Sequence, residues 1–332
     1  MRQRCLRLIA AIALLAFVAV PAYGEVSAIR ISHGYGVLYL PLMVMESEKL
    51  LEKQARAADL GDVKVTYLVL DGGNVINDAM LSGALDIASI GVAGFLTLWA
   101  KAKDNPALEI RGLSGMSSSS LYLMTRNPNV KTLKDFTDKV PGIKTSLPAV
   151  ILHMAVAKEL GDANYSKLDP ITVGLPHPEA LTVLLSGKGE INSHMASPPF
   201  SYIEDATPGL HRVFNSVDVL GNITLDMTYT SRKFYEANPK LCTAFIAAMN
   251  EANALIARDR KKAAEIYLAV SKQKSSADEI VKILDDPNSK FSTMPDGTMK
   301  YADFMFRVGT IKAKPASWKD LFFPPIHGSA GS

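Results

Sequence analysis

Short apolar segments and amphipathic segments alternate along the first third of the chain, beginning at residue 29. Runs rich in β-branched residues predict strands, and apolar positions three or four residues apart predict helices. The expected strands are 29–32, 63–70, 86–90 and 110–113, and the expected helices are 38–53, 75–81 and one that opens at 91–94 and runs through Ala102. This alternation is typical of an α/β protein with a parallel sheet. In such a sheet, ligands bind beyond the carboxyl ends of the strands.

A Leu-Ser-Gly motif occurs twice, and each copy is followed by an acidic residue and a short apolar run. The first copy is 81–87 and the second is 185–191, so the acidic residues are Asp86 and Glu190. A strand, a helix, a second strand and a second helix are expected before each copy. The repeat therefore predicts two similar α/β lobes with a cleft between them, where a ligand would bind.

Two segments are expected to connect the lobes. The serine-rich stretch 114–120 leads into the apolar strand 121–124, and the apolar run 223–229 leads back. The composition of 114–120 alone fits a flexible surface loop almost as well. We expect residues 25–116 and 226–332 to form lobe 1 and residues 117–225 to form lobe 2, with helices after Pro239. Two crossings would make a hinge, and hinge closure traps ligands in two-lobed binding proteins.

The N-terminus has the pattern of a secretory signal peptide. Arg2, Arg4 and Arg7 precede an apolar run at 8–20, and small residues follow it. We expect residues 1–24 to be removed on export to the periplasm. The apolar run is short for the alternative, a membrane anchor.

Charge and cysteine content narrow the function classes. The chain has 36 Lys and Arg against 33 Asp and Glu, and loss of the three signal-peptide arginines leaves the two signs equal. A neutral surface argues against nucleic acid and against a polybasic membrane contact. Cys242 would be the single cysteine of the mature chain, so no internal disulfide is expected.

No pattern for catalysis, a metal or a cofactor emerges. The six histidines lack metal-ligand spacing, and 33–36 resembles a nucleotide turn without its third glycine. We therefore expect a protein that is not an enzyme and that needs no metal and no cofactor. His33 and His194 fall in expected cleft loops, where each is either a ligand contact or a histidine bonded to the backbone.

Several motifs in order resemble a known family. They are the export signal, the paired Leu-Ser-Gly-x-x-(Asp/Glu)-Ile segments, the run 235–239 before a long helix, and the C-terminal run 301–322. Over the whole mature chain, the sequence is similar to the nitrate/sulfonate/taurine-type substrate-binding proteins of bacterial ABC transporters. The resemblance implies a two-lobed periplasmic-binding-protein fold of type II with two crossing hinge segments. It also implies a periplasmic, monomeric receptor that captures a small molecule by cleft closure and hands it to a cognate inner-membrane permease.

The resemblance implies that the strand-end loops contact the ligand. Mapped onto this chain, the contacts are Gly34, Tyr35, Gly73, Asn74, Val92, Ala93, Ser117, Ser118 and Ser146, with His194 on the facing lobe and Asp226 on a crossing. None of these loops carries Arg or Lys, so an anion would have to be held by helix N-termini. Asp226 either meets a ligand amine or pairs with a structural arginine.

The ligand classes of such proteins are sulfonates, taurine, nitrate, pyrimidines and aromatic acids. Two alternatives stay open from the residues alone: an exported enzyme on the same fold and a ligand sensor.

Overall fold

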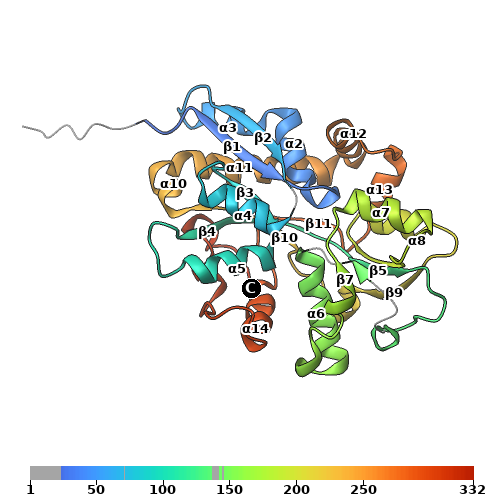
Figure 1. The fold of residues 1–332 in the computed structure, drawn as a ribbon. Coiled ribbons are helices and arrows are strands. Elements are labelled where there is room, and N and C mark those ends of the chain that lie inside the picture. Colours follow the sequence, from blue (N-terminus) through green and yellow to red (C-terminus); the bar gives the residue numbers. More distant parts are fainter. Residues whose placement is uncertain (1–23, 71, 137–141, 144–145) are drawn as a thin grey trace, which may run out of the picture.

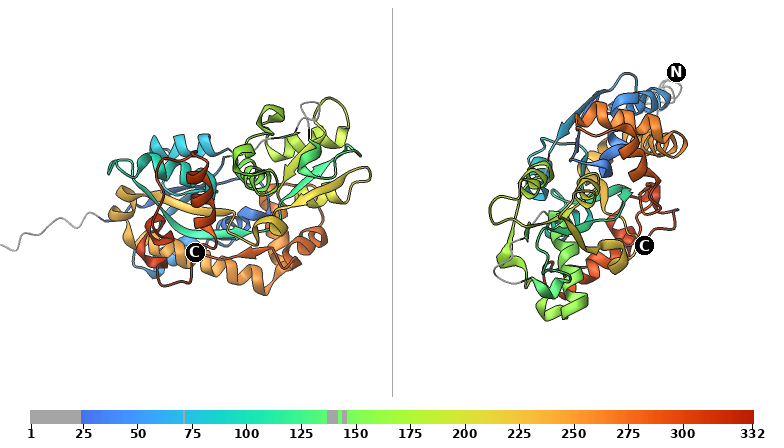
Figure 2. Two further views of the ribbon diagram at one scale, coloured as in Figure 1. Left: turned by 90° about the horizontal axis from the view of Figure 1, so that it is seen from below. Right: turned by 90° about the vertical axis from the view of Figure 1, so that its right-hand side faces the viewer.

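The computed structural model of the protein describes residues 24–70, 72–136, 142–143 and 146–332 (Figure 1). The expected signal peptide, apart from Gly24, lies outside these residues. Within them, no helix combines the length and the apolar character needed to cross a bilayer. The fold is mixed α/β, as the sequence predicts, and Figure 2 shows two lobes side by side with connecting strands between them.

Lobe 1 is built on a mixed sheet in which the first three strands run parallel. β1 pairs with β2 in parallel, and β3 is joined to β1 by a parallel bridge between Ile31 and Ile87. β10 lies antiparallel between β3 and β4, and β11 adds an antiparallel edge beyond β4. The strands are β1 (Ala28–His33), β2 (Lys64–Val69), β3 (Ala88–Gly91), β4 (Ile110–Ser118), β10 (Asp226–Ser231) and β11 (Lys290–Phe291).

Helices cover both faces of this sheet (Figure 1). They are α2 (Leu40–Glu48), α3 (Leu50–Ala57), α4 (Gly73–Leu81), α5 (Val92–Ala102), α10 (Arg232–Ala237), α11 (Pro239–Arg258), α12 (Arg260–Ser271), α13 (Ala277–Asp285), α14 (Thr298–Arg307) and α15 (Trp318–Leu321). The single helix expected over 38–53 is instead two, because Lys49 adopts a left-handed conformation with φ 54°. Its amide caps the end of α2 through Glu46 and Met45.

Lobe 2 repeats the order of the first elements of lobe 1. β6 (Gly142–Ile143), α6 (Ser146–Leu160), β7 (Thr172–Val173), α7 (His177–Ser186) and β8 (Ser193–Ala196) follow in sequence, and β6 pairs with β7 in parallel. The sequence repeat therefore corresponds to a structural one. The lobe is completed by β5 (Tyr122–Thr125), β9 (His211–Asn215), α8 (Phe200–Asp205) and α9 (Ser216–Leu220), with β5 central in an antiparallel sheet.

The chain crosses between the lobes twice, and a third segment lies against the crossings. β4 leads into β5, and the chain returns from α9 into β10. β11 pairs with the end of β4, setting Lys290 opposite Ser118. The loop before β11 also bonds both crossings: Ser289 shares a hydroxyl hydrogen bond of 3.2 Å with Ser119, and Asn222 donates to the carbonyl oxygen of Asn288 at 2.9 Å. The hinge is thus braced by a segment that the sequence did not indicate.

Candidate functional site

The loop after β1 brings the two lobes into contact. Gly34 lies so close to Tyr39 that an added Cβ would be 2.8 Å from the ring. Gly36 has φ 99°, and a Cβ there would be 2.7 Å from the carbonyl oxygen of Pro198 in lobe 2. The amide of Val37 donates a 3.1 Å hydrogen bond to that same oxygen. Gly36 therefore allows a close inter-lobe contact that a side chain would prevent, and Gly34 allows Tyr39 to pack closely within lobe 1.

A cavity of about 520 Å³ opens beside this contact, and we call it the inter-lobe cavity. Its walls are largely apolar, with two lysines from the end of α12. Lobe 1 contributes His33, Gly34, Tyr35, Gly36, Met43 and Val69, lobe 2 contributes Pro178, Leu181, Thr182, Phe200 and Ile203, and the α12 end contributes Tyr267, Val270, Ser271, Lys272, Gln273 and Lys274. Its size and lining are those of a small-molecule site. Gly34 and Tyr35 are the two predicted contacts that line it.

A second group of predicted residues gathers where β3, β4 and β10 meet. Asp226 is buried at the start of β10, and the Tyr39 hydroxyl donates to its Oδ1 at 3.2 Å. The amide of Val92 donates to the carbonyl oxygen of Leu225 at 2.9 Å, and Ala93 is buried beside it. The first amide of α5 is thus already bonded within the protein, which leaves this helix start less able to hold an anion.

Gly73 and Asn74 open α4, whose first turn lies against the first turn of α5. A Cβ added to Gly94 would be 4.0 Å from the Cα of Gly73. Gly73 is buried and Asn74 is exposed. Ser146 begins α6, and its side chain lies outside the described residues.

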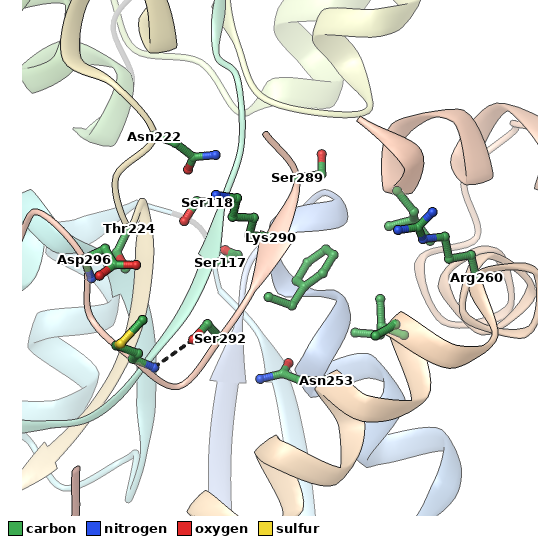
Figure 3. A pocket seen from close by; sticks show the side chains of 15 residues that line it. Ser117, Ser118, Asn222, Thr224, Asn253, Arg260, Ser289, Lys290, Ser292 and Asp296 are labelled. Carbon is green, nitrogen blue, oxygen red and sulfur yellow. Dashed lines mark hydrogen bonds between the residues drawn. The ribbon is translucent and has the colours of Figure 1, made fainter. Parts of the chain in front are cut away.

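Ser117 and Ser118 line a different cavity, of about 450 Å³, behind the hinge (Figure 3). We call it the hinge cavity. It is enclosed by β4, the second crossing, β11 with its flanking loops, and α11 with the start of α12, and its lining is Ser117, Ser118, Asn222, Thr224, Asn253, Ile256, Ala257, Arg260, Leu284, Ser289, Lys290, Phe291, Ser292, Met294 and Asp296. It shares no lining residue with the inter-lobe cavity. The structure therefore separates these two serines from Gly34 and Tyr35.

His194 lies inside lobe 2 and is fully buried. Its Nδ1 is 2.5 Å from Glu204 Oε1, and its Nε2 is 2.9 Å from Nδ1 of His177. His177 in turn stacks on Phe200 at 5.3 Å between ring centroids. His194 therefore approaches the inter-lobe cavity only through His177 and Phe200.

Burial keeps this polar cluster uncharged. It raises the pKa of Glu204 to about 9 and lowers the pKa of His177 and of His194 to about 3. A protonated Glu204 can donate to His194, which then donates to His177. The cluster joins the start of α7 and the end of α8 to β8. It lies behind the lobe 2 wall of the inter-lobe cavity, where His177 supports Phe200.

His33 is also buried, and its Nδ1 is 3.0 Å from the carbonyl oxygen of Gly34. Burial lowers its pKa, so the ring is neutral near pH 7. This is the backbone-bonded arrangement that the sequence left open, and His33 also lines the inter-lobe cavity.

Sequence reasoning missed His177, Phe200 and the lysines Lys272 and Lys274. The internal repeat carried a signal for His177, since it opens α7 at the position that Gly73 holds at the start of α4. The lysines follow a C-terminal helix far from the repeat, so no motif pointed to them.

Among residues 24–332 with their gaps, no three His, Cys, Asp or Glu side chains are placed to hold a metal ion. Cys242 is buried, and burial raises the pKa of its thiol to about 12. A thiol in that setting is a poor nucleophile.

Comparison with solved structures identifies the fold. The alkanesulfonate-binding protein SsuA of Xanthomonas axonopodis pv. citri, bound to MOPS, matches with a TM-score of 0.66 and 18% identity, over 86% of this chain and 95% of that one. The periplasmic nitrate-binding protein NrtA of Synechocystis PCC 6803 matches with a TM-score of 0.69 and 14% identity, over 90% and 84%. The periplasmic aliphatic sulphonate binding protein of Escherichia coli matches with a TM-score of 0.65 and 17% identity, over 91% and 93%.

No protein-family model matches the sequence, and no curated protein matches it. The structural likeness confirms the predicted two-lobed periplasmic-binding-protein fold.

Proposed function

We propose that this protein is the periplasmic solute-binding component of an ABC importer of the nitrate/sulfonate/taurine type. The observation that carries the proposal is the inter-lobe cavity, which draws its walls from both lobes of a periplasmic-binding-protein fold. Solved proteins of this fold bind alkanesulfonates and nitrate. The predicted signal peptide supports export, and a cognate permease in the inner membrane is the partner that this role requires.

The lining favours an organic ligand over a small inorganic anion. Leu181, Phe200 and Ile203 offer apolar contact from lobe 2, and Met43 and Val69 offer it from lobe 1. Nitrate has no apolar part to bury against such walls.

Positive charge at the edge of the cavity adds a preference for an anionic head group. Lys272 and Lys274 supply this charge where the predicted strand-end loops carry none. Within the predicted ligand classes, alkanesulfonates and aromatic acids fit this combination best.

The proposed mechanism is capture by closure and involves no catalysis. A ligand that touches both walls contributes free energy only when the lobes are together, so it shifts the population toward the closed state. The hydrogen bond from the Val37 amide to the Pro198 carbonyl oxygen then marks the place where the walls of the two lobes meet. No cofactor and no nucleic acid has a part in it.

Calorimetry and thermal shift with alkanesulfonates, taurine, nitrate, aromatic acids and aminopyrimidines test the proposal, with small-angle scattering to follow closure. We expect saturable binding of at least one compound and a smaller radius of gyration in its presence. Absence of binding across the set, or binding without compaction, would overturn the proposal.

A matched pair of variants tests whether the ligand occupies the inter-lobe cavity. Leu181→Asp places a charge in its wall, whereas Leu185→Asp places one at an exposed position one helical turn further along, outside the lining. We expect the first to lower affinity more than tenfold and the second to leave it unchanged. Equal effects of the two variants on affinity would show that the ligand does not occupy the inter-lobe cavity.

A further inference from the structure

The hinge cavity contains buried polar groups that the protein leaves unsatisfied. Ser117 is 2% exposed, and its Oγ has no hydrogen-bond partner among the residues that the structure describes. Oδ1 of Asn253, on α11, is buried and likewise has no partner in the described part of the chain. An unsatisfied buried polar group costs roughly 1–3 kcal/mol. Both oxygens have almost no accessible surface, so a small rotation of the Ser117 and Asn253 side chains would be needed to present them to a polar molecule in the cavity.

The charges around the cavity are unevenly placed. Figure 3 shows Lys290 near the centre, Arg260 at one end and Asp296 at the other. Among the residues that the structure describes, Lys290 forms no ion pair, whereas Arg260 is already paired with Asp285. Lys290 is thus the cation that can pair with a single negative charge on a ligand. Asp296 and Asn253 offer acceptors for hydroxyl groups.

We propose that the hinge cavity is a second ligand site, which takes a small hydroxylated carboxylate. The carboxylate would pair with Lys290, and the hydroxyls would bond Ser117, Asn253 and Asp296. The volume of about 450 Å³ is within the range of small-molecule sites. A multiply charged anion such as a phosphate ester fits less well, because Asp296 faces the same space.

The hinge cavity lies between the segments that connect the two lobes, so a ligand bound there would affect the hinge. Its walls include β4, the return crossing at Asn222 and Thr224, and β11. A ligand there would tie together the three segments that connect and brace the lobes. The proposal is independent of which compound fills the inter-lobe cavity.

Isothermal titration calorimetry of the mature protein tests the site with three probes. D-gluconate carries a carboxylate and hydroxyls, sorbitol carries hydroxyls alone, and butyrate carries a carboxylate alone. We expect saturable one-to-one binding of D-gluconate and at least tenfold weaker binding of the other two. No saturable D-gluconate binding up to 10 mM, on the order of the weakest affinities of interest, would overturn the proposal.

Variants locate the binding. Lys290→Gln and Ser117→Ala should each weaken D-gluconate binding at least fivefold. Lys261→Gln, at an exposed position of α12 beside Arg260 and outside the lining, should not change it. Ser117→Ala removes a hydroxyl without a protein partner, so we expect its thermal midpoint to stay at or above that of the wild type. D-gluconate binding that survives both variants but is lost in Leu181→Asp would place the probe in the inter-lobe cavity and overturn the hinge site.

Discussion

The cluster of half-buried His177 with fully buried His194 and Glu204 lies behind the lobe 2 wall of the inter-lobe cavity, where His177 stacks on Phe200. Three titratable groups are held together by contacts of 2.5 and 2.9 Å. A buried charge is costly unless it is paired, so the neutral forms are favoured. The cluster therefore connects α7, β8 and α8 through polar contacts, and its protonation state is linked to folding.

The pH dependence of stability should report on Glu204. Because its folded pKa of about 9 is above the unfolded value near 4.5, the folded state holds a proton that the unfolded state has lost, and stability falls as pH rises from about 6.5 to 9. The slope is about 1.4 kcal/mol per pH unit for one proton. Below about pH 6.5 the two histidines act in the opposite sense, because their pKa is lowered by burial.

Glu204→Gln keeps a hydrogen-bond donor for His194 without a group that titrates. We expect the alkaline loss of stability to be shallower in this variant by about one proton's slope, measured as the free energy of unfolding in urea at several pH values. Parallel pH profiles for wild type and variant would show that Glu204 is ionised in the folded protein.

For single residues, the sequence predicted which positions lie near the inter-lobe cavity better than it predicted where their side chains point. Gly34 and Tyr35 reach the inter-lobe cavity because the end of β1 fixes where they emerge. His194 lies within β8, where neighbouring side chains point to opposite faces. No periodicity in a strand of four fully buried residues indicates which face carries the ligand.

The hinge is an arrangement of elements in which β11 and its flanking loop hold both crossings. Thr224, on the return crossing, and Asp296 form a two-way clasp: the amide of Thr224 donates to the Asp296 carbonyl oxygen, and the Asp296 amide donates to Thr224 Oγ1, each at 2.8 Å. Thr224 is buried. This clasp ties the C-terminal part of lobe 1 to the hinge.

Thr224→Val should destabilise the protein by about 1–3 kcal/mol, because the Asp296 amide loses its acceptor in a buried place. Thr224→Ser keeps the hydroxyl and removes one methyl group, which costs about 1 kcal/mol. Urea unfolding of the two variants compares these effects directly. If valine were tolerated as well as serine, the clasp would not stabilise the hinge.

The sequence predicted the strands and helices of the repeat but not β11. A strand of two residues has too short a pattern to be recognised, and its pairing with β4 joins residues about 170 positions apart. The break at Lys49 also escaped prediction, since a left-handed residue other than glycine leaves no clear signal in composition.

At the scale of the whole molecule, the lobes are held together by contacts at two sides of the hinge. On one side the Val37 amide meets the Pro198 carbonyl oxygen. On the other, Arg307 of α14 forms an ion pair with Asp162 in lobe 2. That pair is exposed, and exposed pairs contribute little. The backbone contact at Pro198 is therefore the more important of the two for closure.

Gly36→Ala tests this contact. The new Cβ would lie 2.7 Å from the Pro198 carbonyl oxygen, closer than non-bonded atoms approach, so the loop and lobe 2 must separate. We expect a larger radius of gyration in small-angle scattering. We also expect affinity for any compound that binds the inter-lobe cavity to fall about tenfold, which corresponds to about 1.4 kcal/mol taken from the closed state.

Gly61→Ala is the control for an alanine placed at a positive φ without a close neighbour. Gly61 also has a positive φ, of 69°, but no atom of the described residues lies within 4 Å of its added Cβ. Gly61→Ala should lose about 1 kcal/mol of folding stability from its positive φ. Gly36→Ala should lose about 1–3 kcal/mol, because its φ of 99° and ψ of 172° lie in a region almost restricted to glycine, and only this variant should open the lobes. If both variants, or neither, changed the radius of gyration, closure would not depend on the meeting of this loop with Pro198. The cleft would then have to be held shut by the ligand and the hinge alone.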